Sequence, residues 1–393
     1  MNLKNAPRGA HCGGVEECCT ATRRRRRISQ ARFFLAVDTK NACGMEISMR
    51  YPEFLKENGR IGFLAPSFGC ATEPYKAGFI RAQEIWKGQG YELILGKNCY
   101  EAAGVGISNT PEKCGEEIME MFASKAQVLI SCGGGELMCE TLPHVDFEKL
   151  AAEEPRWFMG YSDNTNLTYL LATLTDTASV YGPCAAAFGM EPWHDSLKDA
   201  MEILQGKRTR VRSYGFWEKE SRKDEEHPYE PYALTEPLQI KRYLGRKEVP
   251  EKERLQGRGR LLGGCMDCLV NLTGTKFDRT TAFVEKYRED GILWFLEACD
   301  LNVFAIRRAM WQMEQAGWFS HVSGFLIGRP ANGEAMMNLD ACEAVLAVAG
   351  KYQVPVWMDV DLGHRPPMMP LIVGSLAEVD SVGNTLEIEM KRL

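Results

Sequence analysis

The chain has 393 residues, 45% hydrophobic and 25% charged, a balance that excludes disorder over most of its length. No apolar run approaches the roughly 18 residues of a membrane-spanning helix, so we expect no membrane association through such a segment. Ten of the 47 Lys and Arg residues but only four of the 53 Asp and Glu residues lie in residues 1–50. The remainder is acidic, which argues against nucleic acid as the main partner.

Residues 1–48 differ from the rest, and we expect them to be a basic, disordered extension. They contain a run of five arginines, at 23–27, and have no helical or strand periodicity. The apolar stretch at 33–37 is shorter than the 7–15 apolar residues of a secretory signal, so export is not predicted. Two other interpretations stay open: the arginines bind nucleic acid or another anionic surface, or the His and Cys residues hold a metal.

Residues 49–211 alternate short apolar runs with helix-like patterns. Strands are predicted at 60–67, 91–95, 126–131 and 157–161, and helices at 75–88, 111–123 and 165–174. This alternation indicates parallel βαβ units, whose ligands gather beyond the carboxyl ends of the strands. We therefore expect an α/β domain over 49–211.

Two strand ends of this half carry possible chemistry. Gly133 and Gly134, in a run of three glycines, let the backbone approach a ligand closely, although a triple glycine is more often a plain turn. Ser162 lies between a predicted strand and a predicted helix, where a hydroxyl can project above the sheet as a nucleophile. The alternative is that Ser162 or Asp163 simply caps the helix.

Residues 212–258 are charge-dense and aromatic, which predicts a linker or lid. Regular patterning resumes at 259–264, the start of a C-terminal domain over 259–393, with strands predicted at 291–297, 322–328 and 354–359 and a helix at 303–317. Glu297 and His364 each stand where a strand meets a loop. If each residue is judged by itself, the sequence favours a structural role: Glu297 pairs with an arginine such as Arg307, and His364 is a turn residue. If Ser162 is a nucleophile, His364 is its best candidate base.

The fourteen cysteines are scattered through apolar segments, which favours free thiols in a reducing, cytoplasmic compartment. The closest pair apart from the extension, Cys265 and Cys268, has no second CxxC to complete a four-ligand zinc site. We therefore interpret this pair as packing residues, and we expect no bound metal.

A series of motifs then resembles the LD-carboxypeptidase family of serine peptidases, which includes the microcin C immunity peptidases. In chain order the motifs are Ala65-Pro66-Ser67, the glycine run at 133–135, Gly160-Tyr161-Ser162-Asp163, Tyr181-Gly182-Pro183, 259–264, Phe295-Leu296-Glu297 and Gly363-His364. The resemblance covers about residues 49–393. It implies a flavodoxin- or glutamine-amidotransferase-like parallel-sheet domain, followed by a C-terminal α/β domain with a small β-barrel-like sheet.

The resemblance also implies a function. Ser162, Glu297 and His364 would form a catalytic triad, and the amides of Asp163 and of Gly133 or Gly134 would form the oxyanion hole. The expected reaction is release of the terminal D-alanine from muramoyl tetrapeptides in the cytoplasm, and it needs no metal or other cofactor. The resemblance also implies that the enzyme is a homodimer. The immunity branch instead cuts the amide that joins a peptidyl aspartate to a nucleotide.

Several residues near the expected site depart from the family pattern, so the pattern does not identify the substrate. Relatives often have asparagine where this chain has Cys265, an acidic residue where it has Ala298, and arginine and tyrosine flanking the glycine run. The long 212–258 segment is more like the immunity branch, in which aromatic lid residues stack on the base; Trp217 or Trp193 would do so here. From another class, a non-catalytic ligand-binding protein on the same fold remains an alternative.

Overall fold

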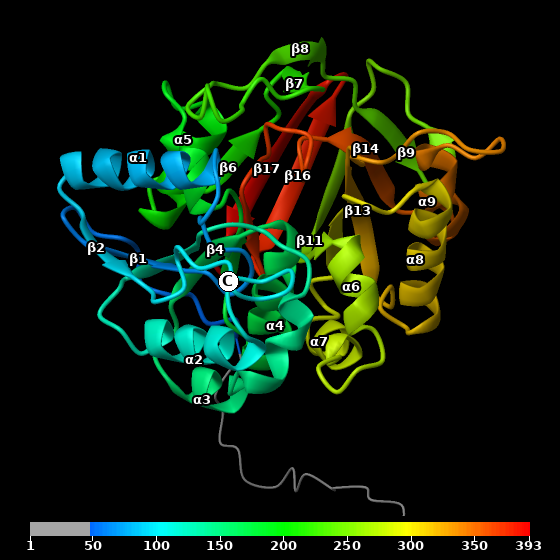
Figure 1. Cartoon of the computed structure of the whole chain (residues 1–393). Coiled ribbons are helices and arrows are strands. Elements are labelled where there is room, and N and C mark those ends of the chain that lie inside the picture. The colour runs from blue at the N-terminus through cyan, green and yellow to red at the C-terminus, as the bar shows by residue number, and fades with distance from the viewer. Residues whose placement is uncertain (1–47) are drawn as a thin grey trace, which may run out of the picture. The chain divides into compact units, whose positions relative to one another are not determined.

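Two β-sheets organise the chain in a computed structural model that describes residues 48–393 (Figure 1). Residues 1–47, and with them almost all of the predicted basic extension, lie outside the described residues. None of the helices in residues 48–393 is both long enough and apolar enough to cross a membrane.

The first sheet has six strands in the order β15-β5-β4-β3-β1-β2. These are β1 (Arg60–Leu64), β2 (Glu92–Leu95), β3 (Val128–Ser131), β4 (Trp157–Gly160), β5 (Ser179–Tyr181) and β15 (Leu371–Val373). Strands β1 to β5 are parallel and β15 is antiparallel. The parallel βαβ units predicted from the sequence are confirmed.

Five helices accompany this sheet, and Figure 1 shows α1 and α2 on its opposite sides. They are α1 (Tyr75–Gly88), α2 (Pro111–Phe122), α3 (Phe147–Ala152), α4 (Thr165–Thr175) and α5 (Asp195–Leu204). Helix α2 begins where expected because Pro111 stands at its first turn and the Thr110 side chain accepts the backbone N–H of Lys113.

The second sheet has nine strands in the order β10-β9-β14-β13-β12-β11-β16-β17-β6. They are β6 (Arg210–Arg212), β9 (Lys241–Leu244), β10 (Lys247–Glu248), β11 (Leu255–Cys265), β12 (Ile292–Glu297), β13 (Val322–Gly328), β14 (Pro355–Val360), β16 (Leu376–Val382) and β17 (Thr385–Lys391). The expected C-terminal sheet is present, but it is large and open: β10 and β6 are its two edges, so the described residues form no closed barrel.

Four helices belong to this second half: α6 (Met266–Leu272), α7 (Thr280–Lys286), α8 (Val303–Gln315) and α9 (Ala341–Ala349). Figure 1 shows α8 and α9 side by side next to strands β13 and β14. Strands β11 to β14 are parallel, which is why their polar end residues emerge at one edge.

Each half of the chain lends a strand to the other half's sheet. Strand β15 comes from the C-terminal half, after β14, yet it pairs with β5 in the first sheet. Strand β6 comes at the end of the N-terminal half, yet it pairs with β17 in the second sheet. The segment 212–258 is also more regular than a linker: β7 (Phe216–Glu218) pairs with β8 (Leu234–Pro237), and β9 joins the second sheet beside β14. The two halves are therefore interlocked by backbone hydrogen bonds.

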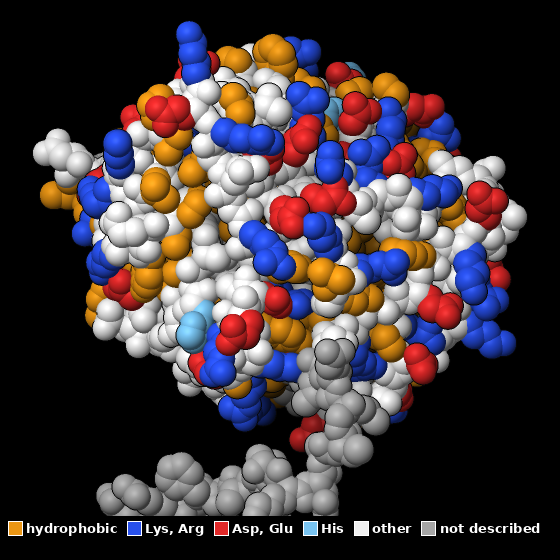
Figure 2. Space-filling model, turned by 180° about the vertical axis from the view of Figure 1, so that it is seen from behind, with side chains coloured by type: hydrophobic (Ala, Val, Ile, Leu, Met, Phe, Trp, Pro, Cys, Tyr) orange, Lys and Arg blue, Asp and Glu red, His pale blue; other side chains and the backbone are white. Residues whose placement is uncertain are grey.

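A continuous hydrophobic core lies beneath both sheets. Five tryptophans are fully buried in it: Trp86, Trp157, Trp294, Trp318 and Trp357. On the face drawn in Figure 2, acidic and basic side chains are intermixed, with hydrophobic side chains scattered among them. Exposed ion pairs of this kind contribute little to stability, so the core carries most of it.

Candidate active site

Ser162 lies immediately beyond the carboxyl end of β4, in a turn of 3-10 helix (Ser162–Asn164) that leads into α4. Its φ is +62°, a conformation that few residues other than glycine adopt. The turn is tight, since a Cβ on Gly160 would lie 2.8 Å from the Cβ of Asn164. Sharp strand-to-helix turns with a strained serine are typical of hydrolase nucleophiles.

Glu297 is the last residue of β12, and it is fully buried. Its Oε1 accepts a hydrogen bond of 2.5 Å from the hydroxyl of Tyr181, and its Oε2 lies 2.9 Å from Nδ1 of His364. A Cβ on Gly363, whose φ is +85°, would lie 2.3 Å from that same Oε2. Only glycine at 363 therefore allows the histidine loop to approach the carboxylate this closely.

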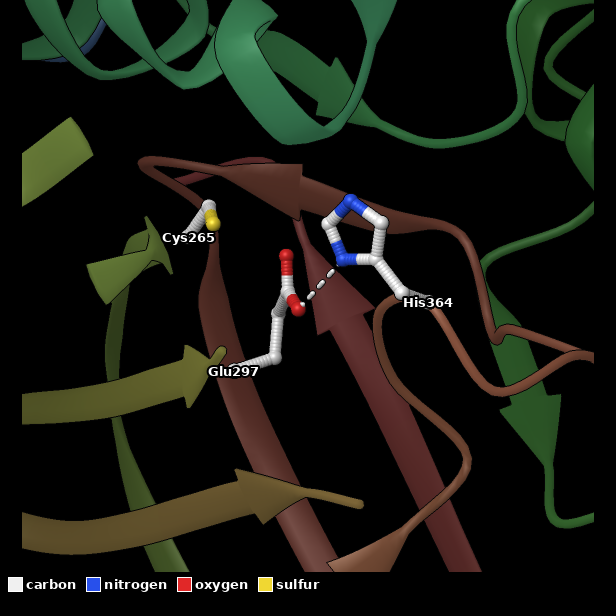
Figure 3. A group of neighbouring side chains, drawn as sticks. All are labelled: Cys265, Glu297 and His364. Carbon is white, nitrogen blue, oxygen red and sulfur yellow. Dashed lines mark hydrogen bonds and ion pairs between the residues drawn. The ribbon is translucent and has the colours of Figure 1, made fainter. Parts of the chain in front are cut away.

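His364 connects the other two residues. Its Nδ1 faces Glu297, as Figure 3 shows, and its Nε2 lies 2.8 Å from Oγ of Ser162. Serine, histidine and glutamate thus form one hydrogen-bonded chain, although they come from three separate parts of the sequence. A carboxylate on one ring nitrogen and a hydroxyl on the other is the arrangement of a serine-hydrolase triad.

The charges within this chain stabilise each other. Burial lowers the pKa of His364, but the negative charge of Glu297 and the hydrogen bonds to Cys299 and Glu297 together outweigh burial and hold that pKa well above its ordinary value. Burial raises the pKa of Glu297, yet the charge of His364 and the hydrogen bonds from His364 and Tyr181 bring it below its usual range. The carboxylate is therefore ionised, and it stabilises a positively charged imidazole.

Tyr181 is a member of the site whose role the sequence did not reveal. Its hydroxyl donates to Glu297 and also accepts the backbone N–H of Ser162 at 3.3 Å. Its position could have indicated this role, because Tyr181 ends β5, and β5 lies next to β4, which leads to Ser162. Neighbouring parallel strands end at the same edge of a sheet. Tyr181 thus connects the carboxylate to the turn that carries the serine.

The predicted oxyanion residues surround Ser162. A Cβ on Gly134 would lie 3.2 Å from the Cβ of Ser162, and Gly133 is held by a 2.8 Å hydrogen bond from Asn164 Nδ2 to its carbonyl. The Asp163 side chain is buried, and it accepts hydrogen bonds from Ser67 Oγ and the Met138 amide. Gly134 and Asp163 therefore flank the serine, while Gly133 is one residue further away.

A pocket of about 170 Å³ opens over Ser162, and it is acidic. Four carboxylates line it, and among its described lining residues none is basic: the carboxylates are Glu136, Asp163, Asp267 and Asp300. Burial, followed by the negative charges of the other three, raises the pKa of Glu136. Such a pocket favours a ligand with a positively charged group.

Four cysteines line the same pocket: Cys139, Cys265, Cys268 and Cys299. Cys265 lies beside Glu297, on the side away from His364 (Figure 3). Its neighbour Cys268 and its burial raise its pKa well above the usual range, so Cys265 is a thiol and no competing nucleophile.

The two tryptophans predicted to bind substrate lie elsewhere. Trp193 packs against Trp86 and Phe188, with its indole N–H donating to the Phe188 carbonyl at 2.7 Å. The ring of Trp217 lies under the guanidinium of Arg329, in a separate pocket. Neither ring lines the pocket over Ser162.

Two known domains match the two halves of this arrangement. The LD-carboxypeptidase N-terminal domain matches residues 61–182, and the LD-carboxypeptidase C-terminal domain matches residues 258–379. The chain belongs to the LD-carboxypeptidase family. The first match includes Ser162 and Tyr181, and the second includes Glu297 and His364.

Individual members of the LD-carboxypeptidase family are distant in sequence. The microcin C7 self-immunity protein MccF of Escherichia coli is 23% identical over 336 residues, which cover 84% of this chain and 92% of that protein. The murein tetrapeptide carboxypeptidase of Pseudomonas aeruginosa is 21% identical over 311 residues, which cover 78% and 88%.

Solved structures of LD-carboxypeptidase relatives share the fold. The wild-type apo form of MccF superposes with a TM-score of 0.71 at 22% identity, covering 87% of this chain and 99% of that one. The muramoyltetrapeptide carboxypeptidase of Oxalobacter formigenes gives 0.62 at 17% identity, covering 84% and 98%. The predicted fold class is confirmed, and the names of the relatives support peptidase activity.

Proposed function

We propose that the chain is a serine hydrolase that cleaves the C-terminal amide bond of a short peptide through an acyl-enzyme. The observation that carries the proposal is the unbroken hydrogen-bonded chain from Ser162 Oγ through His364 to Glu297. A hydroxyl is a poor nucleophile at neutral pH and needs an adjacent base, and a base needs an orienting group. A protein that only bound its ligand would need neither.

In this mechanism His364 Nε2 takes the proton of Ser162 as the oxygen attacks the scissile carbonyl. Glu297 holds the Nδ1 proton in place and stabilises the imidazolium that forms. The amides of Asp163 and Gly134 donate to the oxyanion, each contributing about 3–4 kcal/mol in comparable sites. His364 then protonates the leaving amine, and it later activates the water that hydrolyses the ester.

The substrate that fits best is a muramoyl tetrapeptide, from which D-alanine is released. A relative of this fold is named as a muramoyltetrapeptide carboxypeptidase. In the acidic pocket, Glu136, Asp267 and Asp300 would attract an ammonium group of the peptide, so the C-terminal carboxylate of the peptide would lie outside this pocket, as would a phosphate. The microcin relative, by contrast, is known in complex with adenosine monophosphate, an anion.

Comparing two substrates on wild type and Ser162→Ala tests the proposal. Wild type is expected to release D-alanine from a muramoyl tetrapeptide, detected by mass spectrometry, and to leave aspartyl sulfamoyl adenosine largely intact. Efficient cleavage of the nucleotide instead would establish the immunity-like activity. Full turnover by a folded Ser162→Ala would exclude the serine mechanism.

A fluorophosphonate probe separates an enzyme from a binding protein. An active hydrolase forms an adduct on Ser162, located by peptide mapping, and His364→Gln is expected to lose most of the labelling because the hydroxyl is no longer activated. Absence of any adduct on the wild type would favour the non-catalytic alternative.

We also propose that the enzyme works as a cytoplasmic homodimer, as the family resemblance implies. The ten cysteines of residues 48–393 are all free, which suits a reducing compartment. Light scattering coupled to size-exclusion chromatography measures the assembly, and a monomer at micromolar concentration would contradict the dimer.

A further inference from the structure

Cys265 changes what the catalytic residues can bind. Its Sγ, a carboxylate oxygen of Glu297 and a ring nitrogen of His364 all lie within 4.8 Å of one another. One thiol, one carboxylate and one imidazole are three of the ligands that zinc accepts. In Figure 3 the carboxylate stands between the sulfur and the ring.

We propose that Cys265, Glu297 and His364 form an inhibitory site for Zn²⁺, which switches the serine off when it is occupied. Zinc ligands at about 2.0–2.3 Å from the metal stand roughly 3.3–3.8 Å apart in a tetrahedron. The three donor atoms, which lie within 4.8 Å of one another, therefore need to approach each other by at most about 1.5 Å. Calcium and magnesium prefer oxygen ligands alone, so this donor set favours zinc over them.

The surroundings hold these ligands in place. The backbone N–H of Cys265 donates to Thr165 Oγ1 at 3.0 Å, and a Cβ on Gly264 would lie 2.6 Å from the methyl group of Thr165, so β11 is fixed against α4. The second oxygen of Glu297 is held by Tyr181. Such outer hydrogen bonds orient metal ligands and raise affinity.

The site is also reachable. Cys265 lines the pocket over Ser162, which provides a path from solvent. Three protein ligands leave one position of a tetrahedral ion for a water molecule from that pocket. An ion therefore approaches the site from the sulfur side, because Glu297, which is fully buried, and His364 do not line this pocket.

Zinc would stop catalysis by changing which nitrogen of His364 carries a proton, and this step rests on the proposed function. In the catalytic tautomer, Nδ1 of His364 carries a proton and donates a hydrogen bond to the ionised carboxylate of Glu297. When zinc binds Nδ1, that proton is relocated to Nε2, and the Cys265 thiol releases its proton to solvent. Nε2 then faces Ser162 as a donor and can no longer accept the serine proton.

Cobalt(II) is the probe for the test, because it enters zinc sites and a thiolate ligand gives it a charge-transfer absorption. The full-length chain is used with Cys12, Cys18, Cys19 and Cys43 replaced by serine, which removes the thiols of the N-terminal segment. We expect one equivalent of Co²⁺ to produce the absorption and one equivalent of Zn²⁺ to abolish it. Cys265→Ser is expected to lose the absorption and to bind Zn²⁺ at least about tenfold more weakly.

Cys139→Ser is the matched control, because it removes a different thiol of the same pocket and is expected to keep the absorption. Circular dichroism verifies folding, and if Cys265→Ser is unfolded, Glu297→Gln tests the same site by its weaker Co²⁺ binding. Absence of the absorption in the parent protein, or an unchanged absorption in Cys265→Ser, would overturn the site.

Inhibition is measured separately, by D-alanine release with Zn²⁺ and after addition of a chelator. Turnover is expected to fall with zinc and to recover with the chelator, and Cys265→Ser is expected to resist zinc. Zinc binding without inhibition of an active enzyme would overturn the switch. Because the cobalt spectrum requires no turnover, failure of the proposed peptidase activity and failure of the metal site give different results.

Discussion

Ser162 Oγ and His364 Nε2 lie 2.8 Å apart although 202 residues of chain separate them. Because the imidazole must be neutral to accept the serine proton, the protonation of His364 governs the reaction. This contact makes the pH dependence of turnover a direct test of the site.

We expect kcat/KM to rise with pH through the pKa of His364, which Glu297 holds well above its ordinary value of 6.5. Below that pKa the ring is protonated and cannot act as the base. Glu297→Gln removes the charge that raises the pKa, so the rise is expected to move to lower pH, with a reduced maximal rate because the imidazolium loses its partner.

A pH-rate profile of both proteins measures the shift. Glu191→Gln, which removes one exposed charge that pairs with Arg81 and does not line the pocket over Ser162, serves as its control and is expected to leave the profile in place. An unmoved profile in Glu297→Gln would contradict the coupling of Glu297 to His364.

Tyr181→Phe is expected to lower both stability and turnover. The buried carboxylate of Glu297 loses a donor at 2.5 Å, and hydrogen bonds to charged groups contribute about 1.5–3 kcal/mol. Urea unfolding measures the loss of stability, and kcat is expected to fall because both Glu297 and the Ser162 amide lose a contact.

Tyr169→Phe is the matched control for Tyr181→Phe. Tyr169 is equally buried and makes a 2.7 Å hydrogen bond to Thr280, a neutral partner. We expect a cost of about 0.5–1.5 kcal/mol and little change in kcat. Equal losses of kcat in the two variants would argue against a specific role for Tyr181.

Gly363→Ala is expected to abolish most activity. The new methyl group would lie 2.3 Å from Glu297 Oε2, so the histidine loop must move away from the carboxylate. Gly215→Ala has nearly the same φ, +84°, but nothing lies within 4 Å of its Cβ. Both variants carry about 1–2 kcal/mol of backbone strain, yet only Gly363→Ala is expected to lose turnover. Comparable kcat values would show that the close approach is unnecessary.

Asp361→Asn is expected to destabilise the fold by about 3–5 kcal/mol. The Asp361 carboxylate is fully buried and lies 2.6 Å from the guanidinium of Arg329, so its loss leaves a buried cation without its partner. Glu343→Gln breaks the exposed pair with Arg246 and is expected to cost at most about 1 kcal/mol. Denaturant unfolding compares the two, and similar small effects would mean that Arg329 finds another partner.

Local sequence was enough to predict the four longest helices and most of the parallel strands, but fewer than half of all the helices and strands in residues 48–393. The runs at 75–88 and 322–328 match α1 and β13, because burial of one helical face, or of a whole parallel strand, leaves its pattern in consecutive residues. The same signals placed Ser162, Glu297 and His364 at strand ends. The family resemblance then joined them, which no single motif did.

Other features depended on pairings between distant segments. No pattern within β15 or β6 says that each completes the other half's sheet, since a three-residue strand is selected by its neighbours. The segment 212–258 looked like a linker because its strands are short and half-exposed, so their apolar periodicity is weak.

The sequence alone therefore determined the type of the four longest helices and of most parallel strands, and which side chains were available at the strand ends. Tertiary structure decided which of them meet: the hydroxyl of Tyr181 at Glu297, the thiol of Cys265 beside that carboxylate, and the indoles of Trp193 and Trp217 away from the serine. The physical reason is the distance along the chain over which each kind of interaction acts. Helix and strand periodicity act over a few residues, whereas a buried carboxylate takes its partners from whatever the packing of the whole chain places within about 3 Å.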